Sequence, residues 1–168
     1  SLQRLVSKQK LESGDKDALL TRIRSTTRMD DIAACDVVIE AATENLDLKL
    51  KIFADLDRIA KPTAILASNT SSISLTKIAG TTKRPAQVIG MHFFNPVPVM
   101  PLVELIRALQ TSDATYQAIR TLTEKLGKSP VEVRNSPAFV GNRILLPMLN
   151  EAVYCLHEGL ATAEDIDS

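Results

Sequence analysis

The sequence predicts an α/β fold in which a parallel or mixed β-sheet is covered by helices on both faces and is followed by a helical region. Two observations predict this architecture. Short apolar segments of strand length alternate with amphipathic helical segments between residues 36 and 133. From Phe139 onward the alternation stops and one long apolar helical segment begins. We therefore expect an α/β domain over residues 1–135 and the first part of an all-α domain over residues 136–168.

The N-terminal part of the chain is predicted to be helical. Apolar residues recur at helical spacing between Leu2 and Glu12, and Ser13-Gly14-Asp15 interrupts them. Aspartate is a preferred N-cap residue, so we expect Asp15 to cap a second helix. The apolar residues of that helix are Ala18, Leu19, Leu20 and Ile23.

The rest of the chain supplies the strands and the remaining helices. Apolar runs predict strands at residues 36–42, 64–68, 87–94, 102–106 and 130–133. Helical spacing predicts helices at residues 46–59, 74–79 and 111–126, which end at Lys61-Pro62, Gly80 and Gly127. Ser112 is expected to cap the third of these helices. Residues 139–157 are predicted to form one long helix that is kinked or starts late at Pro147, and Asp165 starts a further capped segment.

Composition excludes several classes of protein. The 168-residue chain is 45% hydrophobic and 24% charged, and its 20 basic residues balance its 20 acidic ones. Such a chain is not intrinsically disordered, and it lacks the basic excess of a dedicated nucleic-acid-binding protein. No apolar run approaches the roughly 20 residues that span a bilayer, and the N-terminus lacks the apolar core of a signal peptide. We therefore expect neither a membrane nor a nucleic acid as a partner.

The two cysteines, Cys35 and Cys155, are too few for a disulfide framework and show no metal-ligand spacing. We expect a reducing, cytoplasmic compartment and no metal site.

Polar side chains follow three of the predicted strands, where open α/β sheets bind their ligands. They are Thr43-Glu44-Asn45 after the first strand, Ser68-Asn69-Thr70-Ser71-Ser72 after the second, and His92 at the end of the third. The Ser68–Ser72 run could bind a substrate oxygen or a cofactor ribose, or it could be a turn that caps the next helix. Glu44 and Lys49 fit a solvated helix N-terminus, although both lie on the ligand side of the predicted sheet.

His92 is the candidate general base, because the pKa of an unperturbed histidine is about 6.5. The alternative is a buried histidine that a backbone carbonyl satisfies. Glu104 interrupts an otherwise apolar strand, so on a neighbouring strand it would be buried and would need a partner. A carboxylate at the far nitrogen of His92 would fix the tautomer of the ring and stabilise its protonated form. Glu104 could instead lie on the solvent side of an edge strand.

Two polar residues of the predicted long helix have open roles. Asn142 is either an ordinary polar residue or an amide that points into the cleft between the domains. His157 is expected to be exposed.

Four stretches of the chain together resemble the 3-hydroxyacyl-CoA dehydrogenase family, particularly its bacterial 3-hydroxybutyryl-CoA members. They are VIEAATENLDLK, ASNTSSIS, GMHFFNPVPVMPLVELI and NSPAFVGNRILLPMLNEA, and they run in the family's order across nearly the whole chain. The third stretch is highly specific by itself. The resemblance implies a partial Rossmann-type NAD-binding domain over residues 1–135, followed by the start of the helical C-terminal domain over residues 136–168.

The resemblance also implies an activity and its residues. The expected reaction is the reversible, NAD-dependent oxidation of (S)-3-hydroxyacyl-CoA, of short chain such as 3-hydroxybutyryl-CoA, to 3-oxoacyl-CoA in fatty-acid β-oxidation. Its catalytic residues fall on His92, Glu104, Ser71 and Asn142. Its cofactor contacts fall on Glu44, Lys49, Asn69, Ser71 and Asn95. NADP is not excluded as the cofactor, the substrate partner is an acyl-CoA, and the full-length protein is expected to be a homodimer.

Two departures from the family pattern stand out. Ala138 occupies a position where the family pattern SPGFVxNR has glycine, so a positive φ there would strain the chain. The glycine-rich phosphate-binding turn and most of the helical domain are absent, so we expect a fragment that binds cofactor weakly. The alternatives are a catalytically silent fragment or interaction module, and a related dehydrogenase that acts on another 3-hydroxy acid.

Overall fold

The computed structural model describes residues 6–9 and 12–168, which fall into two compact units, Ser1–Asp31 and Ile32–Ser168. In the first unit, α2 (Ser13–Leu20) begins after Glu12, so the prediction that Asp15 caps this helix was wrong. Gly14 lies in the first turn, where backbone N–H groups need no helical partner, and it therefore does not interrupt the helix. Ile23 lies beyond α2 and is exposed. The helix predicted between Leu2 and Glu12 lies largely outside the described residues.

The second unit is built on one five-stranded sheet with the order β1-β2-β3-β4-β5. Neighbouring strands are parallel except for β3 and β4, which are antiparallel, so of the predicted alternatives, a parallel or a mixed sheet, the sheet is the mixed one. The strands are β1 (Val37–Glu40), β2 (Ile65–Ser68), β3 (Val88–Phe93), β4 (Leu102–Arg107) and β5 (Ser129–Arg134). The register places Glu40 beside Ser68 and His92 beside Glu104.

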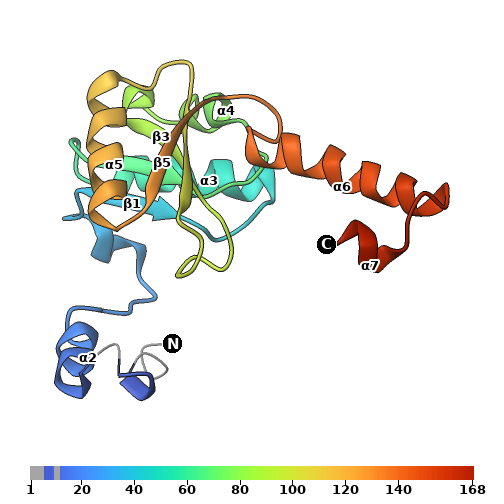
Figure 1. The fold of residues 1–168 in the computed structure, drawn as a ribbon. Helices are drawn as coiled ribbons and strands as arrows, with labels where there is room; N and C mark the ends of the chain where they lie inside the picture. The colour runs from blue at the N-terminus through green and yellow to red at the C-terminus, as the bar shows by residue number, and fades with distance from the viewer. Residues whose placement is uncertain (1–5, 10–11) are drawn as a thin grey trace. The chain divides into compact units, whose positions relative to one another are not determined.

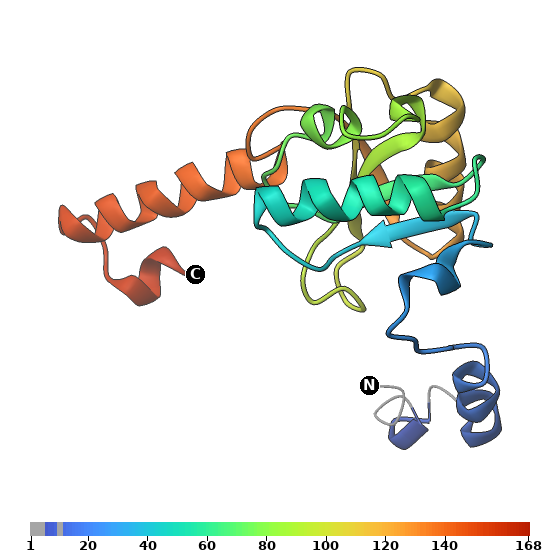
Figure 2. The same ribbon diagram turned by 180° about the vertical axis from the view of Figure 1, so that it is seen from behind.

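Helices cover both faces of this sheet, as Figures 1 and 2 show from opposite sides. On one face, α3 (Leu46–Ile59) and α4 (Leu75–Ala79) bury Phe53, Leu56, Leu75 and Ile78 against alternate strand residues such as Leu66 and Ile106. On the other face, α5 (Asp113–Lys125) buries Tyr116 and Ile119 against Ile89, Met91 and Leu105. Short 3-10 helices lie at Met29–Ile32 and Pro85–Gln87.

Polar side chains start these helices. Asn45, Ser74 and Ser112 each accept a hydrogen bond from a backbone N–H in the first turn of α3, α4 and α5. The bounds of α3 agree with the prediction, and Ser112 is confirmed as the cap of α5.

The last two helices are α6 (Gly141–His157) and α7 (Ala163–Ile166). Helix α6 runs from Gly141 through Pro147, so of the two predicted alternatives, a kink or a late start at Pro147, the late start was wrong; the proline removes only one backbone donor. None of its residues is buried, His157 included, and many of its apolar side chains are exposed. Helix α7 is capped by Thr162, not by Asp165. Among the described residues, no helix is long and apolar enough to cross a membrane.

The segment that joins β5 to α6 has an unusual backbone. Ala138 has φ 61° and Phe139 has φ 52°, both in the left-handed region that favours glycine. The strain that the sequence suggested for Ala138 is therefore present. The Phe139 side chain packs into the core with Val133, Leu75 and their neighbours.

Candidate active site

His92 and Glu104 form a buried pair at the centre of the site. They lie directly opposite each other on the antiparallel strands β3 and β4. His92 is 5% exposed and Glu104 is 1% exposed. The Nδ1 atom of His92 is 2.8 Å from Oε2 of Glu104. The histidine is therefore bound by a carboxylate and not by a backbone carbonyl, and Glu104 does not face solvent.

Ser71 lies at the other nitrogen of the His92 ring. Its Oγ is 3.1 Å from Nε2. When Nδ1 donates to the Glu104 carboxylate, Nε2 of the neutral ring is an acceptor, and the Ser71 hydroxyl donates to it. The ring also contacts the aromatic rings of Phe94 and Phe139, with centroids 4.7 and 5.8 Å away. Ser71, His92 and Glu104 therefore form a continuous relay (the Ser71–His92–Glu104 relay) beside apolar rings.

The second oxygen of Glu104 is held by the backbone at the start of α6. Oε1 accepts hydrogen bonds from the N–H groups of Val140, at 3.0 Å, and Gly141, at 2.8 Å. Burial raises the pKa of Glu104, but the hydrogen bonds from His92, Gly141 and Val140 outweigh it, so the pKa lies below its ordinary value. Glu104 is therefore a carboxylate that can stabilise a protonated His92.

Sequence reasoning missed Val140 and Gly141, because a backbone donor has no side-chain signature. The one available signal was the glycine itself. A Cβ at Gly141 would lie 2.6 Å from the Phe94 ring, so glycine allows the start of α6 to come close to the relay.

The residues of the Ser68–Ser72 run have separate tasks. Asn69 accepts a hydrogen bond from the Phe93 N–H through Oδ1, at 2.8 Å. Thr70 accepts from the N–H groups of Ser72 and Ile73, so the turn interpretation is right for this residue. Ser71 alone of the run contacts His92.

Glu44 holds the loop that carries Ser71. Its Oε1 accepts from the Ser71 N–H at 2.8 Å, and its Oε2 accepts from the Thr70 hydroxyl at 2.7 Å. The position of Ser71 therefore depends on Glu44 as well as on His92.

Lys49 is buried, with 1% of its surface exposed, so the expectation of a solvated residue was wrong for it. Its ammonium group is paired with the Glu40 carboxylate and lies 3.3 Å from Ser68 Oγ. Glu40 also accepts hydrogen bonds from the Ala42 N–H and the Ser68 hydroxyl. Burial raises the pKa of Glu40, but its bonds with Lys49, Ala42 and Ser68 bring it below the ordinary value. Glu40 was also missed, although it interrupts apolar residues as Glu104 does.

A pocket of about 220 Å³ lies where β1 and β2 end. It is lined by Ala41, Ala42, Thr43, Glu44, Lys49 and Asn69. Three of the cofactor residues expected from the sequence therefore line one pocket.

Two expected site residues are not joined to these groups by hydrogen bonds. Asn95 follows β3 and is exposed. Asn142 directly follows Gly141 in α6 and is half-buried. Among residues 6–9 and 12–168, neither side chain has a hydrogen-bond partner. Over the same residues, no cluster of His, Cys, Asp or Glu side chains could hold a metal ion.

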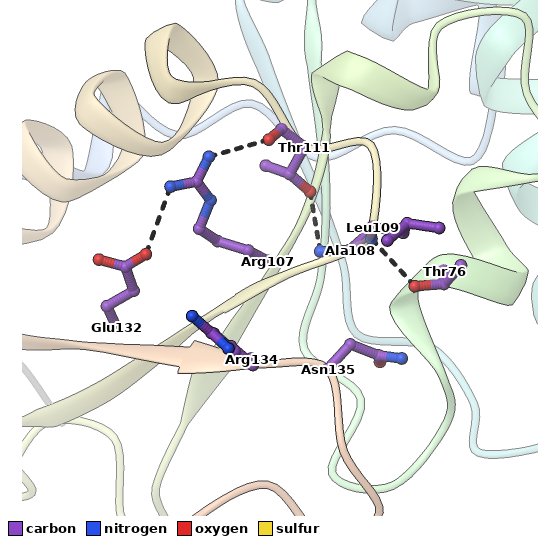
Figure 3. Close-up of a pocket in the computed structure, with 8 residues that line it drawn as sticks. All are labelled: Thr76, Arg107, Ala108, Leu109, Thr111, Glu132, Arg134 and Asn135. Atoms are coloured by element: carbon purple, nitrogen blue, oxygen red, sulfur yellow. Dashed lines mark hydrogen bonds and ion pairs between the residues drawn. The ribbon is translucent and has the colours of Figure 1, made fainter.

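A larger pocket, of about 520 Å³, lies beside the carboxyl ends of β4 and β5, where Arg107 and Arg134 end the two strands (Figure 3). Arg107 in this pocket is paired with Asp113 at 2.6 Å and with Glu132 at 3.3 Å. None of the expected site residues lines it.

Family models match both parts of the chain. The model described as "3-hydroxyacyl-CoA dehydrogenase, NAD binding domain" matches residues 1–136, and "3-hydroxyacyl-CoA dehydrogenase, C-terminal domain" matches residues 139–168.

Individual relatives agree with these matches. The chain is 50% identical over 168 residues to 3-hydroxybutyryl-CoA dehydrogenase of Bradyrhizobium diazoefficiens, covering 100% of this chain and 57% of that protein. It is 41% identical to human mitochondrial hydroxyacyl-coenzyme A dehydrogenase, covering 100% of this chain and 55% of that protein. The crystal structure of (S)-3-hydroxybutyryl-CoA dehydrogenase from Ralstonia eutropha superimposes with a TM-score of 0.93 at 58% identity, over 98% of this chain and 58% of that one. The chain thus spans less than two thirds of the length of these relatives. It has the Rossmann-like α/β fold of these enzymes, and it belongs to the 3-hydroxyacyl-CoA dehydrogenase family.

Proposed function

We propose that this chain carries the catalytic relay of an enzyme that oxidises (S)-3-hydroxyacyl-CoA reversibly to 3-oxoacyl-CoA with NAD. The observation that supports the proposal most directly is the Ser71–His92–Glu104 relay, with Ser71 Oγ at one ring nitrogen and a buried carboxylate at the other. The names of the relatives, which are 3-hydroxybutyryl-CoA and hydroxyacyl-CoA dehydrogenases, supply the substrate class.

In this mechanism His92 is the general base. Its Nε2 takes the proton of the substrate's 3-hydroxyl group, and the Ser71 hydroxyl, which donates to Nε2 in this structure, turns to donate a hydrogen bond to the same oxygen. The Glu104 carboxylate at Nδ1 holds the ring in the required tautomer and stabilises the imidazolium that forms. The adjacent rings of Phe94 and Phe139 limit the access of water to His92. Asn142, in the first turn of α6, is proposed to bind the substrate near its carbonyl group.

The pocket at the ends of β1 and β2 fits part of a dinucleotide. Its lining is polar, and its 220 Å³ is below the roughly 300–1,000 Å³ of a complete small-molecule site. Glu44, Lys49 and Asn69 would hold NAD there, with Ser71 and Asn95 as further contacts. When bound, NAD would accept the hydride that leaves C3 of the substrate.

The proposal is tested in a full-length protein that carries this sequence, by following NADH oxidation with acetoacetyl-CoA. Replacing the general base in His92→Ala should lower turnover about 10²-fold or more. His157→Ala is the matched control, because His157 is exposed and is expected to have no role. Near-normal turnover of the His92 variant would refute the assignment. Free 3-oxo acids, assayed beside the thioester, separate this reading from a dehydrogenase of another 3-hydroxy acid.

We further propose that residues 1–135 and 136–168 belong to the NAD-binding and helical domains, because the two family models meet between residues 136 and 139. A homodimer is the proposed assembly, since α6 exposes large apolar side chains such as Ile144, Met148 and Val153. The two free cysteines suit a cytoplasmic location.

A further inference from the structure

Asn135 connects two segments of the chain that meet at the relay. It follows directly after β5 and begins the segment that leads to α6. Its Oδ1 accepts a hydrogen bond from the Leu75 N–H at 2.8 Å, and its Nδ2 donates to Ser74 Oγ at 3.0 Å. One side chain therefore binds the start of α4 through both of its polar atoms.

Each of the two connected segments contacts the relay. The loop before α4 carries Ser71, whose hydroxyl contacts Nε2 of His92. The segment after Asn135 ends in Val140 and Gly141, whose N–H groups bind Glu104. Glu104 in turn binds Nδ1 of the same histidine. The hydrogen bonds of the relay and those of Asn135 therefore form one closed cycle of hydrogen bonds that passes through both segments.

The segment between Asn135 and Gly141 needs to be held at both ends. Ala138 and Phe139 lie in the left-handed region of φ, a conformation that non-glycine residues keep only where surrounding contacts impose it. The Glu104 carboxylate holds one end of the segment, the buried Phe139 side chain holds its middle, and Asn135 holds the other end through its side chain and its N–H bond to the Arg107 carbonyl. Loss of the Asn135 bonds would let the segment relax and draw the two N–H groups away from Glu104.

We infer that Asn135 is a positioning residue of the active site: by fixing the start of α4, it places the N–H groups of Val140 and Gly141 on Glu104. The inference rests on the proposed function only for its kinetic consequence. Its structural consequence is measured at the two amides and needs no turnover.

Thr76 supplies a matched control within the same helix. Its Oγ1 accepts a hydrogen bond from the Leu109 N–H at 3.0 Å, and this bond ties α4 to the turn that follows β4 and not to a segment that contacts the relay. Figure 3 shows both residues on the wall of the larger pocket, with Thr76 joined to Leu109 and Asn135 on a neighbouring segment. Thr76→Ala therefore removes a hydrogen bond between the Thr76 side chain and the Leu109 backbone, and leaves the hydrogen-bond cycle through Asn135 unchanged.

The test compares Asn135→Ala, Asn135→Asp and Thr76→Ala by hydrogen exchange at the amides of Val140 and Gly141 and by steady-state kinetics of the full-length protein. Asn135→Ala should speed exchange at these two amides about tenfold, the equivalent of one lost hydrogen bond. It should lower kcat by a similar factor and change the KM for acetoacetyl-CoA less. Asn135→Asp should show wild-type exchange at the two amides and a wild-type kcat, because its carboxylate still accepts from the Leu75 N–H. Thr76→Ala should change neither.

Equal exchange at the two amides in Asn135→Ala and Thr76→Ala would overturn the inference. If Asn135→Ala does not fold, Ser74→Ala decides, because it removes the partner of Asn135 Nδ2 at the start of α4: faster exchange at Val140 and Gly141 than in Thr76→Ala supports the inference, and equal exchange contradicts it. If wild-type protein does not turn over acetoacetyl-CoA, the proposed function fails, while the exchange result still tests the role of Asn135.

Discussion

Two buried glutamates, Glu40 and Glu104, make similar contacts in different regions of the sheet. Each carboxylate binds one basic side chain, Lys49 for Glu40 and His92 for Glu104. Each also accepts backbone N–H groups, and each has a pKa below its ordinary value. Each cluster also contains a serine hydroxyl: Ser68 binds the Glu40 carboxylate, and Ser71 binds His92.

The clusters differ in what the basic partner can do. An ammonium group can only donate hydrogen bonds, so Lys49 serves Glu40 as the cationic partner of an ion pair. An imidazole has two nitrogens, so His92 can donate to the carboxylate through Nδ1 while Nε2 is left as an acceptor that can take a proton. The clusters also differ in range, because Glu40 takes its backbone donor from Ala42, two residues away, and Glu104 takes its donors from residues 36 and 37 positions away.

The largest expected effect on stability is at Glu40. Glu40→Gln leaves the buried Lys49 ammonium without its counter-charge and should cost about 3–5 kcal/mol. Glu104→Gln should cost less, about 1–3 kcal/mol, because it leaves no buried ammonium group without a counter-charge. Urea unfolding of both variants measures the difference. Equal losses would mean that the two clusters do not differ as proposed.

The largest effect on activity should occur at Glu104. In Glu104→Gln the side-chain amide can donate to Nδ1 of His92, which moves the ring proton to Nε2 and removes the base from the substrate side. We expect kcat of the full-length protein to fall about 10²-fold or more. Glu132→Gln is the control, because Glu132 is an exposed glutamate that pairs with Arg107 and makes no hydrogen bond to the relay. Activity near that of the control would contradict the assigned role of Glu104.

Acid should destabilise both clusters in the same direction. The folded pKa of Glu40 and of Glu104 lies below the unfolded value of about 4.3, so the unfolded state binds more protons as the pH falls. The stability that the two carboxylates contribute is present above the unfolded-state pKa and is lost as the pH drops through the folded-state pKa. Urea midpoints measured from pH 6 to pH 3 should therefore fall more steeply in the wild type than in Glu104→Gln. Parallel slopes would show that Glu104 does not contribute.

The smallest effect concerns the strained segment that serves only the Glu104 cluster. Ala138→Gly should stabilise the chain by about 0.5–1 kcal/mol, because the relief of left-handed strain exceeds the added flexibility of the unfolded chain. Gly127→Ala is the reverse control, since Gly127 has φ 70° and open space around its missing side chain. It should destabilise the chain by about 1 kcal/mol. Thermal unfolding shifts of the same sign in both variants would contradict this account.

Much of the fold and the centre of the site follow from the sequence. Periodicity predicted the α3 bounds and a sheet that is parallel or mixed, and residue type predicted that Ser112 caps α5. Glu104 was recognised because a charge interrupts an apolar strand. The contacts that sequence reasoning did not find are of two kinds. The donors at Val140 and Gly141 are backbone groups without a side-chain signature, and Asn135 is an ordinary polar residue until the fold brings Leu75 to it. Lys49 was misjudged because its partner, Glu40, lies on a different element.

The antiparallel pairing of β3 and β4 has a consequence for the order in which the chain assembles. His92 and Glu104 are only 12 residues apart, so loop closure between them is inexpensive and fast, whereas the start of α6 must close a loop about three times as long to reach Glu104. During synthesis, the histidine and its carboxylate can meet as soon as β4 has left the ribosome. The amides that complete the carboxylate's environment arrive later, with the first turn of α6.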